Sequence, residues 1–100
     1  MEFLVRIEVD LPADMPEARR RDLMEAEARR GRDLLKSGAL VRIWRVPGRL
    51  ANVSLYEAAD ATELHVALSS LPLHPWMHVV VEPLAVHPLE SSEQGDSHAA

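Results

Sequence analysis

Hydrophobic and polar positions alternate at the start of the chain. Across residues 3–9, apolar side chains stand at every second position, with mostly charged residues between them. A period of two is typical of a β-strand that buries one face. The sequence therefore predicts a first strand over residues 3–9, followed by a break at 11–16.

The next segment follows a helical period and runs to residue 36. Asp14 is expected to cap this helix, with Pro16 in its first turn and Gly38 as the residue that ends it. At 100° per residue, one arc of the helix is apolar and the opposite arc is charged. The apolar arc contains Leu23, Met24, Leu34 and Leu35.

Turn and capping signals divide the rest of the chain. Pro47-Gly48 marks a turn between two apolar stretches, and Asp60 followed by Glu63 forms a capping box that opens a second helix. The run of three valines at 79–81 is typical of a strand buried on both faces. The predicted elements are strands over 40–46, 50–56 and 77–82, and a second helix ending near residue 70.

The predicted element order is β-α-β-β-α-β, which is an α+β arrangement of the ferredoxin-like type. Two helices would cover one face of a four-stranded antiparallel sheet. Leu40, Trp44 and Val46 are expected on one side of the second strand, where another copy of the chain would cover them. We expect one domain over residues 1–88 and a disordered tail over 89–100, which is polar and small.

Composition narrows the function without naming it. The chain has 100 residues and a net charge of −5, which argues against nucleic acid as its partner. It has no Cys, which excludes disulfides and thiolate chemistry and fits a cytoplasmic location. It has no apolar run long enough to span a membrane. His74 and His78 are separated by Pro75, so they are not a helical zinc pair, and no metal site is predicted.

Glu27 stands out because it lies within the apolar arc of the first helix, four residues after Leu23 and seven before Leu34. Its carboxylate should point into the interface between helix and sheet. Burial raises the pKa of a carboxyl, which suits a general base near neutral pH. The alternative is a structural ion pair or a partly hydrated edge position.

The predicted hairpin offers polar partners for this carboxylate. With a two-residue loop at Pro47-Gly48, Arg45 would lie opposite Leu50 and Ile43 opposite Asn52. One face would then combine a cation with hydrogen-bond donors. A slip in register would change these pairs, and an exposed cross-strand charge is the alternative for Arg45. The expected face contains Arg45, Asn52, Ser54 and Tyr56.

Four short segments together resemble the muconolactone delta-isomerase family: LPADM at 11–15, WRVPG at 44–48, ANVS at 51–54 and LPLHPWM at 71–77. His87 and Pro88 fit the same pattern, and the resemblance runs from about residue 3 to residue 88. It implies a ferredoxin-like fold, a ring-like homo-oligomer (a decamer in known members) and no cofactor or metal. It also implies that the chain converts muconolactone to 3-oxoadipate enol-lactone in the β-ketoadipate route of aromatic breakdown.

The resemblance assigns roles to particular residues. Glu27 would be the base, Asn52 and Ser54 would donate hydrogen bonds to the lactone, and Arg45 would anchor a carboxylate or hold Glu27 ionised. The remaining residues expected to contact substrate are Trp44, Arg49, Leu50, His74 and Trp76.

The chain departs from the family pattern at several positions. Leu50 and Met24 replace polar residues near the expected pocket, so the substrate is either muconolactone or a related enolisable compound. A non-catalytic ligand-binding or assembly subunit, and a cyclase- or dehydratase-like biosynthetic protein, are the alternatives. The other departures are Arg42, Arg49, His74 and His78.

Overall fold

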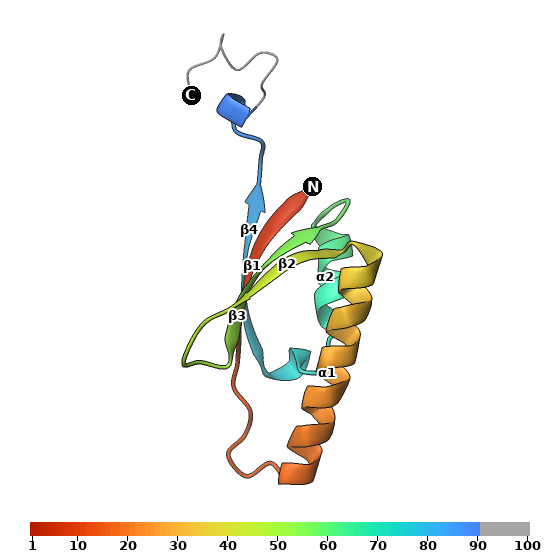
Figure 1. The fold of residues 1–100 in the computed structure, drawn as a ribbon, viewed down its shortest axis with the longest axis vertical. Coiled ribbons are helices and arrows are strands. Elements are labelled where there is room, and N and C mark those ends of the chain that lie inside the picture. The colour runs from red at the N-terminus through yellow and green to blue at the C-terminus, as the bar shows by residue number, and fades with distance from the viewer. Residues whose placement is uncertain (91–100) are drawn as a thin grey trace.

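The computed structural model describes residues 1–90, which form a four-stranded antiparallel sheet with two helices on one face (Figure 1). The strand order is β2-β3-β1-β4, which confirms the predicted ferredoxin-like α+β fold. The elements are β1 (Glu2–Val9), α1 (Glu17–Ser37), β2 (Leu40–Arg45), β3 (Ala51–Glu57), α2 (Ala61–Ser69) and β4 (Met77–Leu84), with 3₁₀ turns at His74–Trp76 and Pro88–Glu90.

The core lies between the sheet and the two helices. Phe3, Val5 and Ile7 point from β1 toward the helices, as the alternating pattern predicts, and all three are buried. Leu34 of α1 and Leu64 of α2 pack into the same cluster. The Pro88–Glu90 turn includes the first two residues of the predicted tail, and the rest of that tail lies outside the described residues.

The ends of α1 match the prediction at one end only. Gly38 ends the helix with a φ of 85°, and its N–H donates to the Leu35 carbonyl at 3.2 Å. Glycine adopts this left-handed backbone conformation at little energetic cost, because it has no Cβ. At the start, Pro16 occupies the N-cap position without a side-chain cap, so the prediction of Asp14 as the cap is wrong. Asp14 lies instead in the turn that leads into the helix.

The β2–β3 hairpin has a longer loop than predicted. Five residues, 46–50, connect β2 to β3, and the Val46 N–H donates to the Ala51 carbonyl at 3.1 Å. Gly48 has a φ of 82°, which a type II turn with Pro47 before it requires. Arg45 therefore pairs with Asn52, and its predicted pairing with Leu50 is wrong. Because the partner moves by two residues, both side chains stay on the expected face.

A register shift between Leu40 and Arg42 changes the side on which β2 begins. Leu40 pairs with Tyr56 and is buried on the helix side, so its predicted grouping with Trp44 is wrong. Trp44 points to the open face of the sheet and is 45% exposed, with the Arg42 guanidinium 5.1 Å from its ring centre. Val80 on the same face is 60% exposed, so burial of β4 on both faces is not found in this single chain.

Candidate active site

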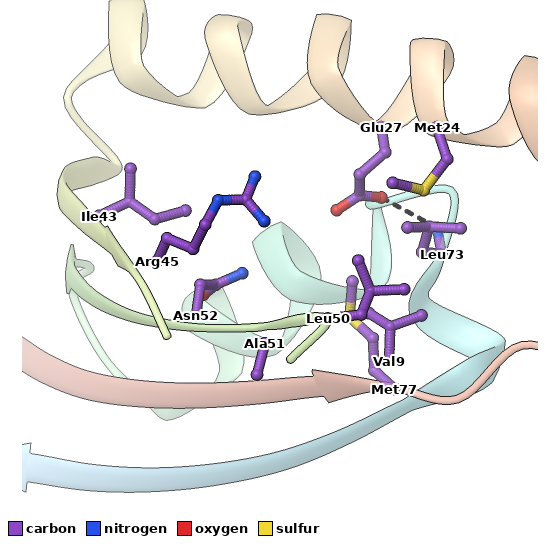
Figure 2. A pocket seen from close by; sticks show the side chains of 10 residues that line it. All are labelled: Val9, Met24, Glu27, Ile43, Arg45, Leu50, Ala51, Asn52, Leu73 and Met77. Carbon is purple, nitrogen blue, oxygen red and sulfur yellow. Dashed lines mark hydrogen bonds between the residues drawn. The ribbon is translucent and has the colours of Figure 1, made fainter. Parts of the chain in front are cut away.

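A cavity of about 300 Å³ lies between α1 and the sheet, and is bordered by the β2–β3 hairpin, Leu73 and the adjoining ends of β1 and β4 (Figure 2). Three polar side chains line it: Glu27, Arg45 and Asn52. The rest of its wall is apolar and is formed by Val9, Met24, Ile43, Leu50, Ala51, Leu73 and Met77. A mostly apolar wall with a few convergent polar groups is typical of a small-molecule site.

Glu27 reaches the cavity from α1 and is half-buried. Its Oε1 accepts a hydrogen bond of 2.9 Å from the backbone N–H of Leu73 (Figure 2). Burial raises the pKa of the Glu27 carboxyl above its ordinary value, and the Leu73 hydrogen bond partly offsets that rise. The carboxylate is thus fixed at one oxygen and made more basic by its surroundings.

The backbone around Leu73 explains why its N–H is available. Leu71 and His74 donate their N–H groups to carbonyls of the preceding turn, at 3.2 and 2.9 Å. Pro72 has no N–H. The Leu73 N–H lies between them and is directed to the carboxylate, while the Leu73 side chain is buried and holds the turn in place.

Arg45 and Asn52 lie directly opposite each other on β2 and β3. Asn52 also pairs with Ile7, whose side chain faces the helices, so all three lie on the helix side of the sheet. The Arg45 guanidinium extends beneath α1 toward the Glu27 side of the cavity (Figure 2). Within residues 1–90, Arg45 has no acidic partner within 4.0 Å.

The oxygen and the nitrogen of the Asn52 side-chain amide face different surroundings. Its Oδ1 is buried and has no hydrogen-bond partner among residues 1–90. Its amide nitrogen points toward the cavity (Figure 2). Two N–H donors are therefore presented to whatever occupies the cavity, next to the Arg45 guanidinium.

Tyr56 lies deeper in the core near Glu27. Burial, reinforced by the negative charge of Glu27, raises the pKa of the Tyr56 hydroxyl to about 12, and the charge of Arg30 acts in the opposite direction. Tyr56 is thus a neutral neighbour of the carboxylate at any pH at which the protein would function.

Of four other predicted site residues, one lines the cavity and three do not. Leu50 lines the cavity. Ser54 is fully buried beneath it and donates to the Val5 carbonyl at 3.3 Å. Arg49 lies on the open face, where its Nε donates to Glu8 at 3.0 Å. Trp44 lies on that same open face, so neither of these two side chains reaches the cavity of its own chain.

His74 and Trp76 flank the site without lining it. His74 borders a second cavity of about 250 Å³ between α2 and β4, where its ring meets that of His65 edge to face at 6.3 Å. The Trp76 ring lies 5.8 Å from the Arg19 guanidinium of α1. Both residues belong to the 3₁₀ turn that directly follows Leu73, whose N–H donates to Glu27.

Sequence reasoning did not identify Val9, Ile43, Leu73 or Met77 as site residues. The alternating pattern of β1 predicts that Val9 points inward, which was a usable signal. The role of Leu73 depends on its backbone N–H, which no side-chain pattern reveals. Among residues 1–90 no helix is long and apolar enough to cross a membrane. In the same range no three His, Cys, Asp or Glu side chains cluster as metal ligands would.

Together these groups favour proton transfer. A carboxylate with a raised pKa can accept and return a proton near neutral pH. A nearby guanidinium and amide can hold an anionic substrate and stabilise negative charge that develops on an oxygen. The apolar remainder of the wall would exclude water from the reacting carbons.

Comparisons with known proteins agree with this chemistry. The family model described as muconolactone delta-isomerase matches residues 1–90. The muconolactone delta-isomerase of Cupriavidus pinatubonensis is 42% identical over 88 residues, which cover 88% of this chain and 96% of that protein. The enzyme of the same name from Acinetobacter baylyi is 35% identical over 88 residues, covering 88% and 92%.

Solved structures give the same result. A crystal structure of muconolactone isomerase superposes with a TM-score of 0.83 at 35% identity, covering 88% of this chain and 92% of that one. A chlorohydroxyhydroquinone dehydrochlorinase from Burkholderia phenoliruptrix shares the fold at 17% identity, with a TM-score of 0.64. These matches give no support to a non-catalytic subunit or to a cyclase- or dehydratase-like protein. The chain belongs to the muconolactone delta-isomerase family and is an isomerase.

Proposed function

We propose that this enzyme moves the ring double bond of a small unsaturated lactone that carries a free carboxylate, with muconolactone as its substrate and without a cofactor. The observation that carries the proposal is the Glu27 carboxylate, which is held by the Leu73 N–H in a cavity that also presents Arg45 and Asn52. The names of the relatives supply the substrate, and the cavity supplies groups of the required chemistry.

The reaction needs one base that serves two carbons. Glu27 removes the proton from the γ carbon of the lactone, and the electron pair of the broken C–H bond spreads over the ring to the carbonyl oxygen as a dienolate. The proton is then returned at the α carbon, so the double bond moves from the α,β to the β,γ position. No atom is gained or lost. One carboxylate can act as base and then acid when it reaches both carbons.

The hydrogen bond from Leu73 gives the two oxygens of Glu27 different surroundings. Oε1 accepts the Leu73 N–H, so its basicity is reduced. We propose that Oε2, which accepts no hydrogen bond from residues 1–90, carries the proton between the two carbons. The carboxylate then stays in place during the transfer, because its anchored oxygen takes no part in the bond changes.

Arg45 and Asn52 would bind the polar groups of the substrate. A guanidinium pairs well with a carboxylate, so Arg45 is our candidate for the anchor of the free acid group. The Asn52 amide nitrogen, which points into the cavity, is our candidate for the donor to the dienolate oxygen. Ser54, whose hydroxyl is occupied by the Val5 carbonyl, would support the strand beneath the substrate instead.

We also propose that the enzyme functions as a homo-oligomer in the cytoplasm. Large hydrophobic side chains are exposed on the open face of the sheet, including Trp44 and Val80. Covering these side chains with a second copy of the chain would remove them from water. The absence of Cys from the sequence fits a reducing compartment.

The test is turnover of muconolactone by the purified protein, followed by ultraviolet absorbance. Wild-type protein should convert the substrate, and Glu27→Gln should lose about 10²- to 10⁴-fold in kcat, the usual contribution of a general base. Glu25→Gln, an exposed residue of the same helix, is the matched control and should remain active. A folded wild-type protein that leaves muconolactone unchanged would reject this substrate.

A further inference from the structure

The segment from Ser70 to Trp76 lies along α1 and contacts it at three levels. Ser70 accepts a hydrogen bond of 2.8 Å from the Arg30 Nε. Leu73 donates its N–H to Glu27 at 2.9 Å. Trp76 has the Arg19 guanidinium 5.8 Å from its ring centre. The catalytic carboxylate is therefore bonded to the middle of a segment whose two ends are each held by an arginine of the same helix.

Hydrogen bonds to neighbouring elements also hold the two ends of the segment. Ser70 is the C-cap of α2, and its hydroxyl donates to the Ala67 carbonyl at 2.6 Å. Trp76 accepts a hydrogen bond at its carbonyl from Asp10 N–H at 2.9 Å, which ties the far end to the end of β1. Movement of the segment relative to α1 would shift the Leu73 N–H, because Leu73 lies between these two tethered ends.

Arg30 is well placed to fix the position of the 70–76 segment along α1. It follows Glu27 by three residues, so the two side chains leave the same side of α1 one turn apart. Their partners, Ser70 and Leu73, are likewise three residues apart. Two adjacent contacts between the same pair of elements resist both sliding and rotation better than one contact does.

We propose that Arg30 and Ser70 are positioning residues for the reaction, and that their hydrogen bond holds the 70–76 segment in the register at which the Leu73 N–H fixes the Glu27 carboxylate. This inference rests on the proposed role of Glu27 as the base. Neither residue lines the cavity, so neither is expected to touch the substrate. Their effect would pass through the orientation of one carboxylate oxygen.

The test uses substitutions at Ser70, which remove the tether and leave the charge of Arg30 in place. Ser70→Ala should lower kcat for muconolactone by about threefold to tenfold with little change in KM, the effect of losing one hydrogen bond that aligns a reacting group. Ser70→Thr keeps the hydroxyl and should restore activity. Ser69→Ala is the matched control, because within residues 1–90 the Ser69 hydroxyl bonds to the His65 carbonyl of its own helix and to nothing on α1.

A second readout separates positioning from simple destabilisation. The Leu73 hydrogen bond lowers the pKa of Glu27, so a weaker bond should move the acid limb of kcat/KM to higher pH in Ser70→Ala. Among residues 1–90, the charged or titratable groups named around Glu27 are Arg45, Arg30 and Tyr56, and the substitution changes none of these three side chains. A lower melting temperature with unchanged kcat and unchanged pH profile would overturn the proposal.

Carbon-13 NMR titration of the Glu27 carboxyl gives the same information without turnover. If wild-type protein fails to isomerise muconolactone but Ser70→Ala still raises the pKa of Glu27, the positioning inference stands and the proposed substrate fails. If wild-type protein is active and Ser70→Ala matches Ser69→Ala in kcat, pH profile and titration, the inference fails and the proposed function stands.

Discussion

Glu27 on α1 accepts a hydrogen bond at 2.9 Å from the backbone N–H of Leu73, a residue 46 positions further along the chain. The bond joins the first helix to the turn that precedes the last strand. It satisfies one oxygen of a half-buried carboxylate and leaves the other toward the cavity. Burial and this bond act on the pKa of Glu27 in opposite directions, and burial has the larger effect.

The first prediction concerns the pH dependence of catalysis. In the proposed mechanism only ionised Glu27 accepts the γ proton, so kcat/KM should fall as pH is lowered through the pKa of this carboxyl. Because burial raises that pKa, the acid limb should lie above the ordinary value of about 4.3 for glutamate. The measurement is kcat/KM for muconolactone across the acid range in buffers of constant ionic strength. An acid limb that coincides with titration of the substrate's own carboxyl would contradict the prediction.

The second prediction concerns stability in the variant Glu27→Gln. The pKa of Glu27 is higher in the folded chain than in the unfolded one, so between these two values the folded state binds more protons. The contribution of this group to the free energy of unfolding is fully present below its pKa in the unfolded chain. It is lost as pH rises through its higher pKa in the folded chain. Glutamine stays neutral and can still accept the Leu73 N–H. At pH 7 the variant should therefore melt at a higher temperature than the wild type.

The pH series provides the control for that measurement. Below about pH 4, where the glutamate of both the folded and unfolded chains takes up its proton, the difference in melting temperature should shrink toward zero. A difference that is the same at pH 4 and pH 7 would mean that the carboxylate charge has no part in it. Glu25→Gln, at an exposed position of the same helix, should show no such pH-dependent gain.

Much of the fold could be predicted because hydrophobic periodicity and terminal signals agree along the chain. The alternation in β1 and the glycine after α1 each specify one local geometry, and the structure has both. The hairpin register could not be predicted from Pro47-Gly48 alone. A type II turn splays the strands, and two further residues are needed before pairing resumes, which moves the partner of Arg45 from Leu50 to Asn52.

The site was partly predictable for a related reason. Glu27 could be identified because a carboxylate on the apolar arc of a helix must enter the interface with the sheet. Arg49 was expected at the site, yet it pairs with Glu8 on the open face. A loop residue has no periodicity to fix its side, so its direction depends on the turn geometry. The Leu73 N–H could not be foreseen, because every residue but proline has one.

The third prediction compares two arginines that the sequence analysis places at the site and the structure separates. Arg45→Gln should raise KM for muconolactone and lower kcat/KM by about 10- to 100-fold, the loss expected for one charge-assisted contact to a carboxylate. Arg45→Lys should retain part of the activity, since it keeps the charge but loses the paired geometry. Arg45 lines the cavity, so the effect should appear mainly in substrate binding.

Arg49→Gln is the matched control for Arg45→Gln. Its partner Glu8 is on the open face, and the exposed pair should contribute at most about 1 kcal/mol to stability. In a single chain this change should leave KM unaltered. A rise in KM for Arg49→Gln comparable to that for Arg45→Gln would contradict the assignment, and would indicate that the open face of one copy contributes to substrate binding.

The last prediction separates two polar residues of β3, the half-buried Asn52 and the buried Ser54. Asn52→Leu should lower kcat by about 10²- to 10³-fold, because it removes the donor proposed to face the dienolate oxygen. It should not lower the melting temperature, because it also removes a buried Oδ1 without a partner among residues 1–90.

Ser54→Ala should have the opposite effects on kcat and on the melting temperature. It breaks the bond to the Val5 carbonyl, at a cost of about 1 kcal/mol in stability, and leaves kcat near the wild-type value. The paired measurements are kcat by ultraviolet absorbance and melting by circular dichroism. If Ser54→Ala lost activity as strongly as Asn52→Leu while remaining folded, the serine hydroxyl would have to reach the substrate, and the donor role would not belong to Asn52 alone.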